Sequence, residues 1–179
     1  RPAGAEPDVR AQAWMALARI ADAQTNVAAA IDAYDQGERA AADTGLKLEN
    51  RLNRARLLAR AGNAEAAVNL LEGAVASAPT HPLGGEAQLE LAGLQLEQGR
   101  AARALEAYQS YLEAYAEPEG QARALMGRAW SLWNLGRYAE AAAAFEKAFP
   151  EQRDAEIRQT ALIKAADAYF ANAQYKLAE

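Results

Sequence analysis

The chain has 179 residues, of which 51% are apolar and 24% charged, a composition that supports a packed core and is too apolar for a disordered segment. Its 24 acidic and 19 basic residues give a net charge of −5, which argues against a nucleic-acid partner because such binders carry a basic stripe. Cysteine is absent, which excludes disulfides and thiolate metal sites. No apolar run reaches the roughly 20 residues of a membrane span. The chain begins at Arg1-Pro2 and stops at Glu179, and we interpret it as a piece of a longer protein.

Alanine recurs at a fixed spacing along the whole sequence. Two series, each with a step of 37 residues, run in constant phase: Ala18, Ala55, Ala92, Ala129 and Ala166, and then Ala30, Ala67, Ala104, Ala141 and Ala178. Two series in phase indicate an internal repeat. After a frayed lead-in over residues 1–10, the repeat predicts units at residues 11–47, 48–84, 85–121 and 122–158, and a truncated fifth unit at 159–179.

Each unit predicts two helices, because strong helix formers carry apolar residues at spacings of three and four. The break between the two helices contains glycine at 61–63, 98–100 and 135–137, as suits a helix C-terminus, whereas 24–26 and 172–174 lack it. Loops that end helices are predicted between units at 43–45, 79–84, 117–120 and 150–154. Asp154 is expected to cap the helix that follows.

The repeated positions resemble the tetratricopeptide repeat family. The fourth unit carries Leu125, Ala129, Leu132, Gly136, Tyr138, Ala141, Phe145 and Ala148; the second carries Ala55, Leu58, Gly62, Ala67, Leu71, Ala74 and Pro79; the first carries Trp14, Leu17, Ala18, Ala30 and Tyr34. The resemblance implies an all-α fold, an α-solenoid of antiparallel helix pairs wound as a right-handed superhelix. The alanines would let the helices of a unit approach closely, and Tyr34, Leu71, Tyr108 and Phe145 would fill the gap to the next unit.

The sequence departs from the family pattern in three ways. The period is 37 rather than the usual 34, which places the extra residues in the loops or in longer second helices. Arg54 and Arg128 occupy a position where the family prefers leucine, so we expect looser or rotated packing there. Tyr111 stands where the family prefers a small residue.

Residues that would indicate catalysis are scarce. His81, the only histidine, lies in a Pro/Gly loop, so neither a zinc site nor a Ser-His-Asp arrangement is expected. Gly84-Gly85 lacks the lysine of a phosphate-binding loop. Glu86, Glu90 and Glu97 are interpreted as a solvated helix face. We therefore expect no enzymatic activity, no cofactor and no metal.

The resemblance implies that the first helix of each unit lines a concave groove for a protein or peptide. The groove positions are polar or basic in the first two units and apolar or aromatic in the last three: Arg19, Asn53, Arg56, Arg60, Leu89, Leu96, Met126, Trp130, Trp133 and Phe170. Trp and Arg are enriched at binding hot spots. Two alternatives stay open: Trp130 and Trp133 pack against the fifth unit, and Arg56 and Arg60 form an ordinary solvated face.

The groove positions do not match the carboxylate clamp of the chaperone-binding members of the family. The clamp positions are occupied by Met15, Arg19, Asn53, Glu86 and Glu90. Only Asn53 matches, and the two glutamates would repel a carboxylate.

We interpret the chain as a non-catalytic interaction scaffold. Its composition resembles bacterial proteins, and its long repeat and acidic balance resemble tetratricopeptide proteins of envelope assembly or polysaccharide export, a resemblance that favours the periplasm. The alternative is a regulatory or ligand-sensing module attached to a catalytic or DNA-binding domain. Self-stacking through the open faces of the terminal repeats is a further expectation.

Overall fold

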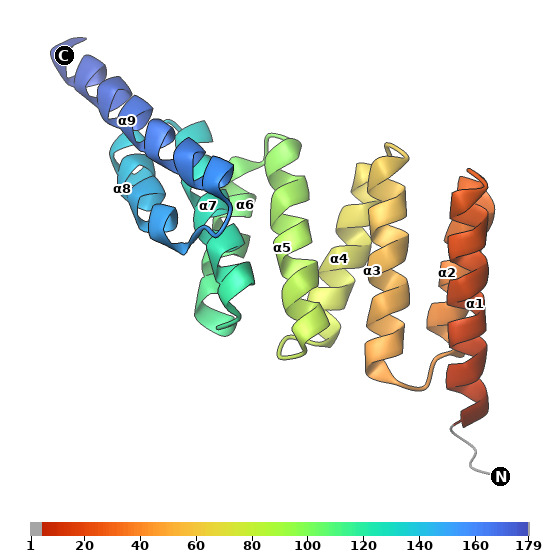
Figure 1. The fold of residues 1–179 in the computed structure, drawn as a ribbon. Coiled ribbons are helices and arrows are strands. Elements are labelled where there is room, and N and C mark those ends of the chain that lie inside the picture. The colour runs from red at the N-terminus through yellow and green to blue at the C-terminus, as the bar shows by residue number, and fades with distance from the viewer. Residues whose placement is uncertain (1–4, 179) are drawn as a thin grey trace. The chain divides into compact units, whose positions relative to one another are not determined.

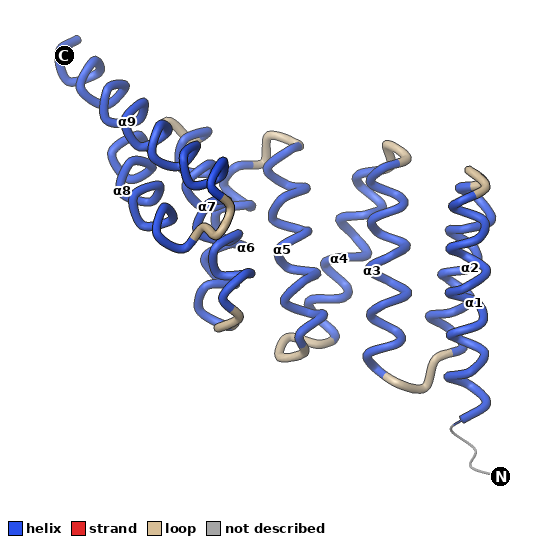
Figure 2. Tube along the Cα trace, viewed as in Figure 1, coloured by secondary structure: helices blue, strands red, loops and turns tan. Residues whose placement is uncertain are grey.

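The computed structural model describes the backbone of residues 5–178 and the side chains of residues 6–173. Within that backbone range every regular element is helical, as Figures 1 and 2 show. The elements are α1 (Ala5–Ala23), α2 (Val27–Ala40), α3 (Thr44–Arg60), α4 (Ala64–Ser77), α5 (Pro82–Glu97), α6 (Ala101–Ala114), α7 (Pro118–Asn134), α8 (Tyr138–Ala148), the 3-10 turn η1 (Phe149–Glu151) and α9 (Ala155–Ala178).

The helices divide into two compact units, Arg1–Ala87 and Gln88–Glu179, and the boundary falls within α5. In unit 1, α2 packs on α1 and α3, and α3 packs on α4. In unit 2, α7 packs on α6 and α8, and α8 packs on α9. Each of these pairs consists of helices adjacent in sequence, as the repeat predicts.

Left-handed residues separate the two helices of each of the first four repeats. Gly62, Gly99 and Gly136 have φ angles of 82°, 74° and 72°, which confirms the predicted helix ends. In the first repeat Thr25 adopts the same conformation with φ of 60°, so this turn forms without glycine. Asn26 then accepts a hydrogen bond from the Ala29 amide at 3.2 Å and caps α2.

The alanine series lies at the helix contacts. Ala18, Ala55, Ala92 and Ala129 are at most 1% exposed, and so are their partners Ala30, Ala67, Ala104 and Ala141. The residues expected between repeats, Tyr34, Leu71, Tyr108 and Phe145, are also buried. Small side chains thus let the helix pairs approach, and one large side chain per repeat fills the remaining space.

The fifth repeat differs from the prediction because α9 is one continuous helix from Ala155 to Ala178. The expected break at 172–174 is wrong, because Asn172-Ala173-Gln174 lies inside α9 and contains no glycine to end the helix. The backbone of Ala178 therefore belongs to α9, and its side chain lies outside the described residues. Ala166 is exposed, unlike its four counterparts, because no second helix of its own repeat covers it.

Helix starts account for the other differences. Residues 5–10 belong to α1 rather than to a frayed lead-in, because Pro7 in the first turn needs no amide donor. Asp8 accepts the amides of Ala42 and Asp43 at 2.7 and 3.0 Å, and these hydrogen bonds lower the pKa of its carboxyl. Pro82 and Pro118 begin helices instead of ending them.

The first helix is the longer one in each complete repeat. The first helices of the four complete repeats have 16 to 19 residues and the second helices 11 to 14. Asp154 accepts the amides of Glu156 and Ile157 at 2.8 and 3.1 Å, which confirms that it caps α9.

Candidate functional site

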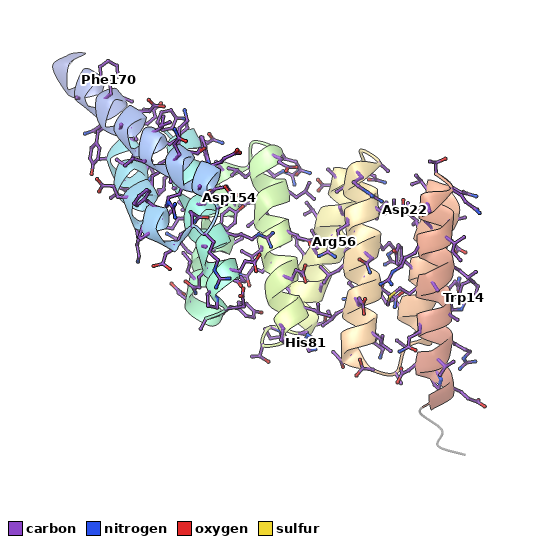
Figure 3. The ribbon with its side chains drawn as sticks, viewed as in Figure 1. Trp14, Asp22, Arg56, His81, Asp154 and Phe170 are labelled. Carbon is purple, nitrogen blue, oxygen red and sulfur yellow. The ribbon has the colours of Figure 1, made fainter. Side chains whose placement is uncertain are left out.

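The predicted basic half of the groove carries paired charges in unit 1. Arg60 on α3 binds Asp22 on α1 at 2.7 Å, and Arg19 on α1 lies 3.3 Å from Glu49 on α3. Arg56 on α3 forms an ion pair with Glu86 on α5. Figure 3 labels Asp22 and Arg56 on their helices.

Each of these pairs joins the first helices of successive repeats, and each arginine is neutralised by a carboxylate. The basic side chains of this stretch are therefore matched by acidic ones. The pairs are largely exposed, so each contributes at most about 1 kcal/mol to folding. Asn53 is half-buried and accepts a hydrogen bond from Arg56 at 3.3 Å.

The tryptophans of α7 meet a lysine of α9 in unit 2. The Lys164 ammonium lies 5.8 Å from the Trp130 ring centre and 5.5 Å from that of Trp133. This geometry is a cation–π interaction with both indoles. Lys164 also binds Asp167 at 2.9 Å.

The same two indoles pack against α8. Trp130 meets Phe145 edge to face with centroids 5.2 Å apart, and Trp133 meets Tyr138 in the same way at 5.2 Å. Both tryptophans are nevertheless only partly buried. They thus pack partly on the core of unit 2 while one part of each ring faces outward.

The remaining predicted apolar residues are unequally accessible. Leu89 is 5% exposed in a cluster with Ala92 and Tyr108, so its expected place on an open surface is wrong. Leu96 and Met126 are half-buried, and Phe170 is 66% exposed. The label in Figure 3 places Phe170 in the C-terminal part of α9.

Ile163 belongs to the same face of α9 as Phe170 and was missed by the sequence reasoning. It is 50% exposed and lies seven residues before Phe170, two helical turns away. The sequence contains the signal that would have identified it, because Ile163 occupies the position of the predicted groove residue Met126 one repeat later. We call Met126, Trp130, Trp133, Ile163, Lys164 and Phe170 the aromatic patch.

The departures from the repeat pattern are accommodated by specific neighbours. The Arg54 side chain is 13% exposed and binds Asp35 and Glu38 of α2, so the packing around it is ion-paired rather than loose. Burial lowers the pKa of Arg54. Tyr111 fits because Gly120 lies against it: a Cβ on Gly120 would come far inside contact distance of the phenol.

Sites for other chemistry are not apparent in the described part of the chain. His81 accepts the Leu83 amide on Nδ1 at 3.1 Å, at the start of α5. Within residues 6–173, no three His, Asp or Glu side chains are grouped as metal ligands would be. None of the described helices is sufficiently long and apolar to cross a bilayer. At the clamp positions, Met15 is buried and Glu86 is paired with Arg56.

Sequence profiles of the tetratricopeptide repeat match residues 52–119 and 122–149. The chain belongs to the tetratricopeptide repeat family. No curated protein shows a significant sequence match to it.

Solved structures show the same fold. A kinesin-light-chain-like protein of Podosopora anserina with nearly identical TPR-like repeats has a TM-score of 0.71 at 22% identity, over 96% of this chain and 90% of that one. The MamA protein has a TM-score of 0.64 at 17% identity, over 93% and 95%. A tetratricopeptide repeat protein from Parabacteroides merdae has a TM-score of 0.54 at 15% identity, over 92% and 75%. The all-α solenoid class of helix pairs is thereby confirmed.

Membership of the tetratricopeptide repeat family has a general functional meaning. Such repeats bind proteins or peptides, and their fold is typically a non-catalytic scaffold. The chain is accordingly a protein-interaction module.

Proposed function

We propose that the chain is a non-catalytic scaffold that binds a protein partner through the aromatic patch of α7 and α9. The observation that carries this proposal is the exposure of Phe170 and Ile163 on the helix whose Lys164 covers the two partly buried tryptophans. Contiguous exposed apolar groups on a soluble protein mark interaction sites, and aromatic residues dominate their energetics.

The chemistry of the patch favours an amphipathic partner segment. The apolar side chains of the partner segment would be buried against Phe170, Ile163 and Met126. The polar side of that segment would face Lys164 and Asp167. Such a segment is recognised by a few anchors at helical or extended spacing. Because Lys164 is paired with Asp167, burial of apolar area would contribute more affinity than net charge.

The unit 1 residues enter the proposal in a different role. Arg19, Asn53, Arg56 and Arg60, with Leu96 in unit 2, remain candidate contact residues of the first helices. Because the three arginines are ion-paired, unit 1 would contact a partner through matched polar groups rather than attract it by positive charge. This pairing and the net charge of −5 also support a partner other than nucleic acid.

Binding to selected peptides tests the patch. Peptides would be selected by phage display on the immobilised chain, and their affinities measured by calorimetry. Phe170→Ala should weaken binding at least tenfold, or about 1.4 kcal/mol, because it removes an anchor without opening the core. Leu162→Ala, which removes an exposed apolar side chain of α9 outside the aromatic patch, is the matched control and should leave the affinity unchanged. Equal affinities for wild type and Phe170→Ala would refute the patch.

We also propose a place in the bacterial cell envelope, in assembly or polysaccharide export, with the chain in the periplasm. Composition, the long repeat and the acidic balance support this proposal, and immunoblotting of fractionated source cells would test it. The alternative is a regulatory or ligand-sensing module. A catalytic or DNA-binding domain in the same polypeptide would favour that alternative.

Self-association is a second candidate function, supported by exposed apolar residues on two helices. Val9, Leu17 and Ile20 on α1 are more than half exposed, and so is Leu162 on α9. We propose that α1 of one molecule packs on α9 of another, which would bury both faces.

A further inference from the structure

A pocket in unit 2 lies on a different set of residues from the aromatic patch. It has a volume of about 730 Å³ and is bounded by α6, α7, the end of α8 and η1. Its charged lining residues are Arg128, Lys147, Glu113 and Glu151. The pocket therefore combines two positive and two negative side chains.

Arg128 is the unusual member of this lining. Its Nε is buried and has no hydrogen-bond partner in the described part of the chain. A guanidinium is always charged and carries five N–H donors, so a buried donor without an acceptor is unfavourable. Glu140 lies near enough to sense the charge of Arg128, but Arg137 already binds that carboxylate at 2.6 and 2.7 Å.

The repeat shows what Arg128 lacks. Two repeat steps earlier the same position is Arg54, whose guanidinium binds the side-chain carboxylates of Asp35 and Glu38. Gln109 and Leu112 occupy the positions of Asp35 and Glu38 two repeats later, and both line the pocket. The pocket is thus lined by the residues that correspond to Asp35 and Glu38, whose carboxylates neutralise Arg54 in unit 1.

Packing of the repeat does not require an arginine at this position. Leu17 and Leu91 occupy it in the first and third repeats. Arg128 thus has neither of the acids that accompany its counterpart, and its side chain lines the pocket.

We propose that this pocket binds the side-chain carboxylate of an aspartate or glutamate in an extended peptide, with Arg128 as the anchoring cation. The carboxylate would take the place that α2 acids fill in unit 1 and would bind the Nη groups of Arg128, as those acids bind the Nη groups of Arg54. Lys147 contributes a second positive charge.

The dimensions and charges of the pocket define the peptide further. Its lining on α7 extends from Pro118 to Arg128, about 15 Å along the helix, which is the length of roughly four or five extended residues. Glu113 and Glu151 offset the two cations, so a peptide with one acidic residue among neutral or basic neighbours fits better than a polyacidic one.

Nuclear magnetic resonance of the whole chain with isotope-labelled arginine tests the proposal. The probe is the pentapeptide Ac-Ala-Ala-Glu-Ala-Ala-NH2, and its matched control replaces glutamate by glutamine. A third peptide, Ac-Ala-Ala-Gln-Ala-Ala-OH, carries only a terminal carboxylate. The glutamate peptide should shift the Arg128 Nε–H signal saturably with a Kd of about 1 mM, and the amidated glutamine peptide should not.

Three variants complete the test. Arg128→Leu, which restores the residue of the first and third repeats, should abolish the saturable shifts of the pocket amides while keeping the circular dichroism of the wild type. Gln109→Asp should reduce the affinity at least tenfold, because it supplies an internal carboxylate as Asp35 does for Arg54. Arg103→Leu, which removes an arginine of α6 outside the pocket lining, should have no effect.

Three outcomes would overturn the proposal. One is the absence of a saturable Arg128 shift up to about 10 mM glutamate peptide. Another is undiminished binding in Arg128→Leu. The third is tighter binding of the free-terminus peptide than of the glutamate peptide, which would assign the pocket to a terminal carboxylate instead.

Discussion

Gly127 on α7 lies directly beneath the ring of Tyr108 on α6, and replacing it with alanine tests the close contact between these helices. A Cβ at residue 127 would lie 2.1 Å from Cζ of Tyr108 and 2.5 Å from Cε1 and Cε2. Carbon atoms pack best about 3.5–4.0 Å apart, so the ring would have to move by roughly 1.4 Å. Tyr108 is 7% exposed and packs with Leu89 and Ala124, which leaves little room for that movement.

The magnitude follows from two opposing contributions. Overpacking of a well-filled core costs about 1–3 kcal/mol, and a rigid ring with three short contacts belongs at the upper end of that range. Alanine is favoured over glycine inside a helix by about 1 kcal/mol. We therefore expect Gly127→Ala to lower the free energy of unfolding by about 2 kcal/mol.

Gly93 on α5 provides the matched control, because it approaches the other end of the same tyrosine. Its Cβ would lie 3.6 Å from the Tyr108 hydroxyl, an ordinary contact, so Gly93→Ala should stabilise the protein by about 0.5–1 kcal/mol. Urea unfolding followed by circular dichroism and tryptophan fluorescence would measure both variants.

A double-mutant cycle identifies the cause of the effect. In a Tyr108→Leu background, which copies Leu71 of the second repeat, Gly127→Ala should no longer be destabilising, because the ring is absent. A steric clash with Tyr108 is refuted if Gly127→Ala stabilises the protein as Gly93→Ala does, or if Gly127→Ala is equally destabilising in the Tyr108→Leu background.

Two further predictions concern a helix cap and self-association. Glu117 accepts the amides of Gly120 and Glu119, and these hydrogen bonds lower the pKa of its carboxyl from the ordinary value of 4.5. Its stabilisation is therefore complete above that value and is lost as the pH falls through the lowered pKa. Glu117→Gln should lower the urea midpoint at pH 7, and the difference from wild type should narrow under acid conditions; a constant difference would exclude the carboxylate as the cause. Stacking of α1 on α9 should give a mass that rises with concentration in sedimentation equilibrium, and Ile20→Asp or Leu162→Asp should each leave a monomer. A concentration-independent wild-type mass would rule out the stacking.

The helix pairs were predictable because their determinants are local and repeated. Gly62, Gly99 and Gly136 end helices through their own backbone freedom, and each buried alanine occupies the same place in successive repeats. A signal that recurs every 37 residues averages out the ambiguity of any single segment. The first repeat shows the limit of this reasoning, since Thr25 forms the turn without the expected residue.

The candidate site was predictable only in part. The repeat register assigned Trp130, Trp133 and Phe170 to first-helix positions, but it could not show that Lys164 covers both indoles. Leu89 was expected on the surface, and the neighbouring helix buries it. Register specifies the position of a residue on its helix, whereas exposure depends on what the adjacent helix places over it.

The sequence by itself determined the architecture: alanine-marked helix pairs, with a turn at the expected position in each of the first four repeats. Tertiary structure alone decided which charges are neutralised. Arg19 and Arg60 find carboxylates 30 and 38 residues away, and Arg54 is matched by acids that Arg128 lacks. The reason is physical: helix formation depends on neighbours within one or two turns, whereas an ion pair or a pocket requires side chains from different helices to meet within a few ångströms.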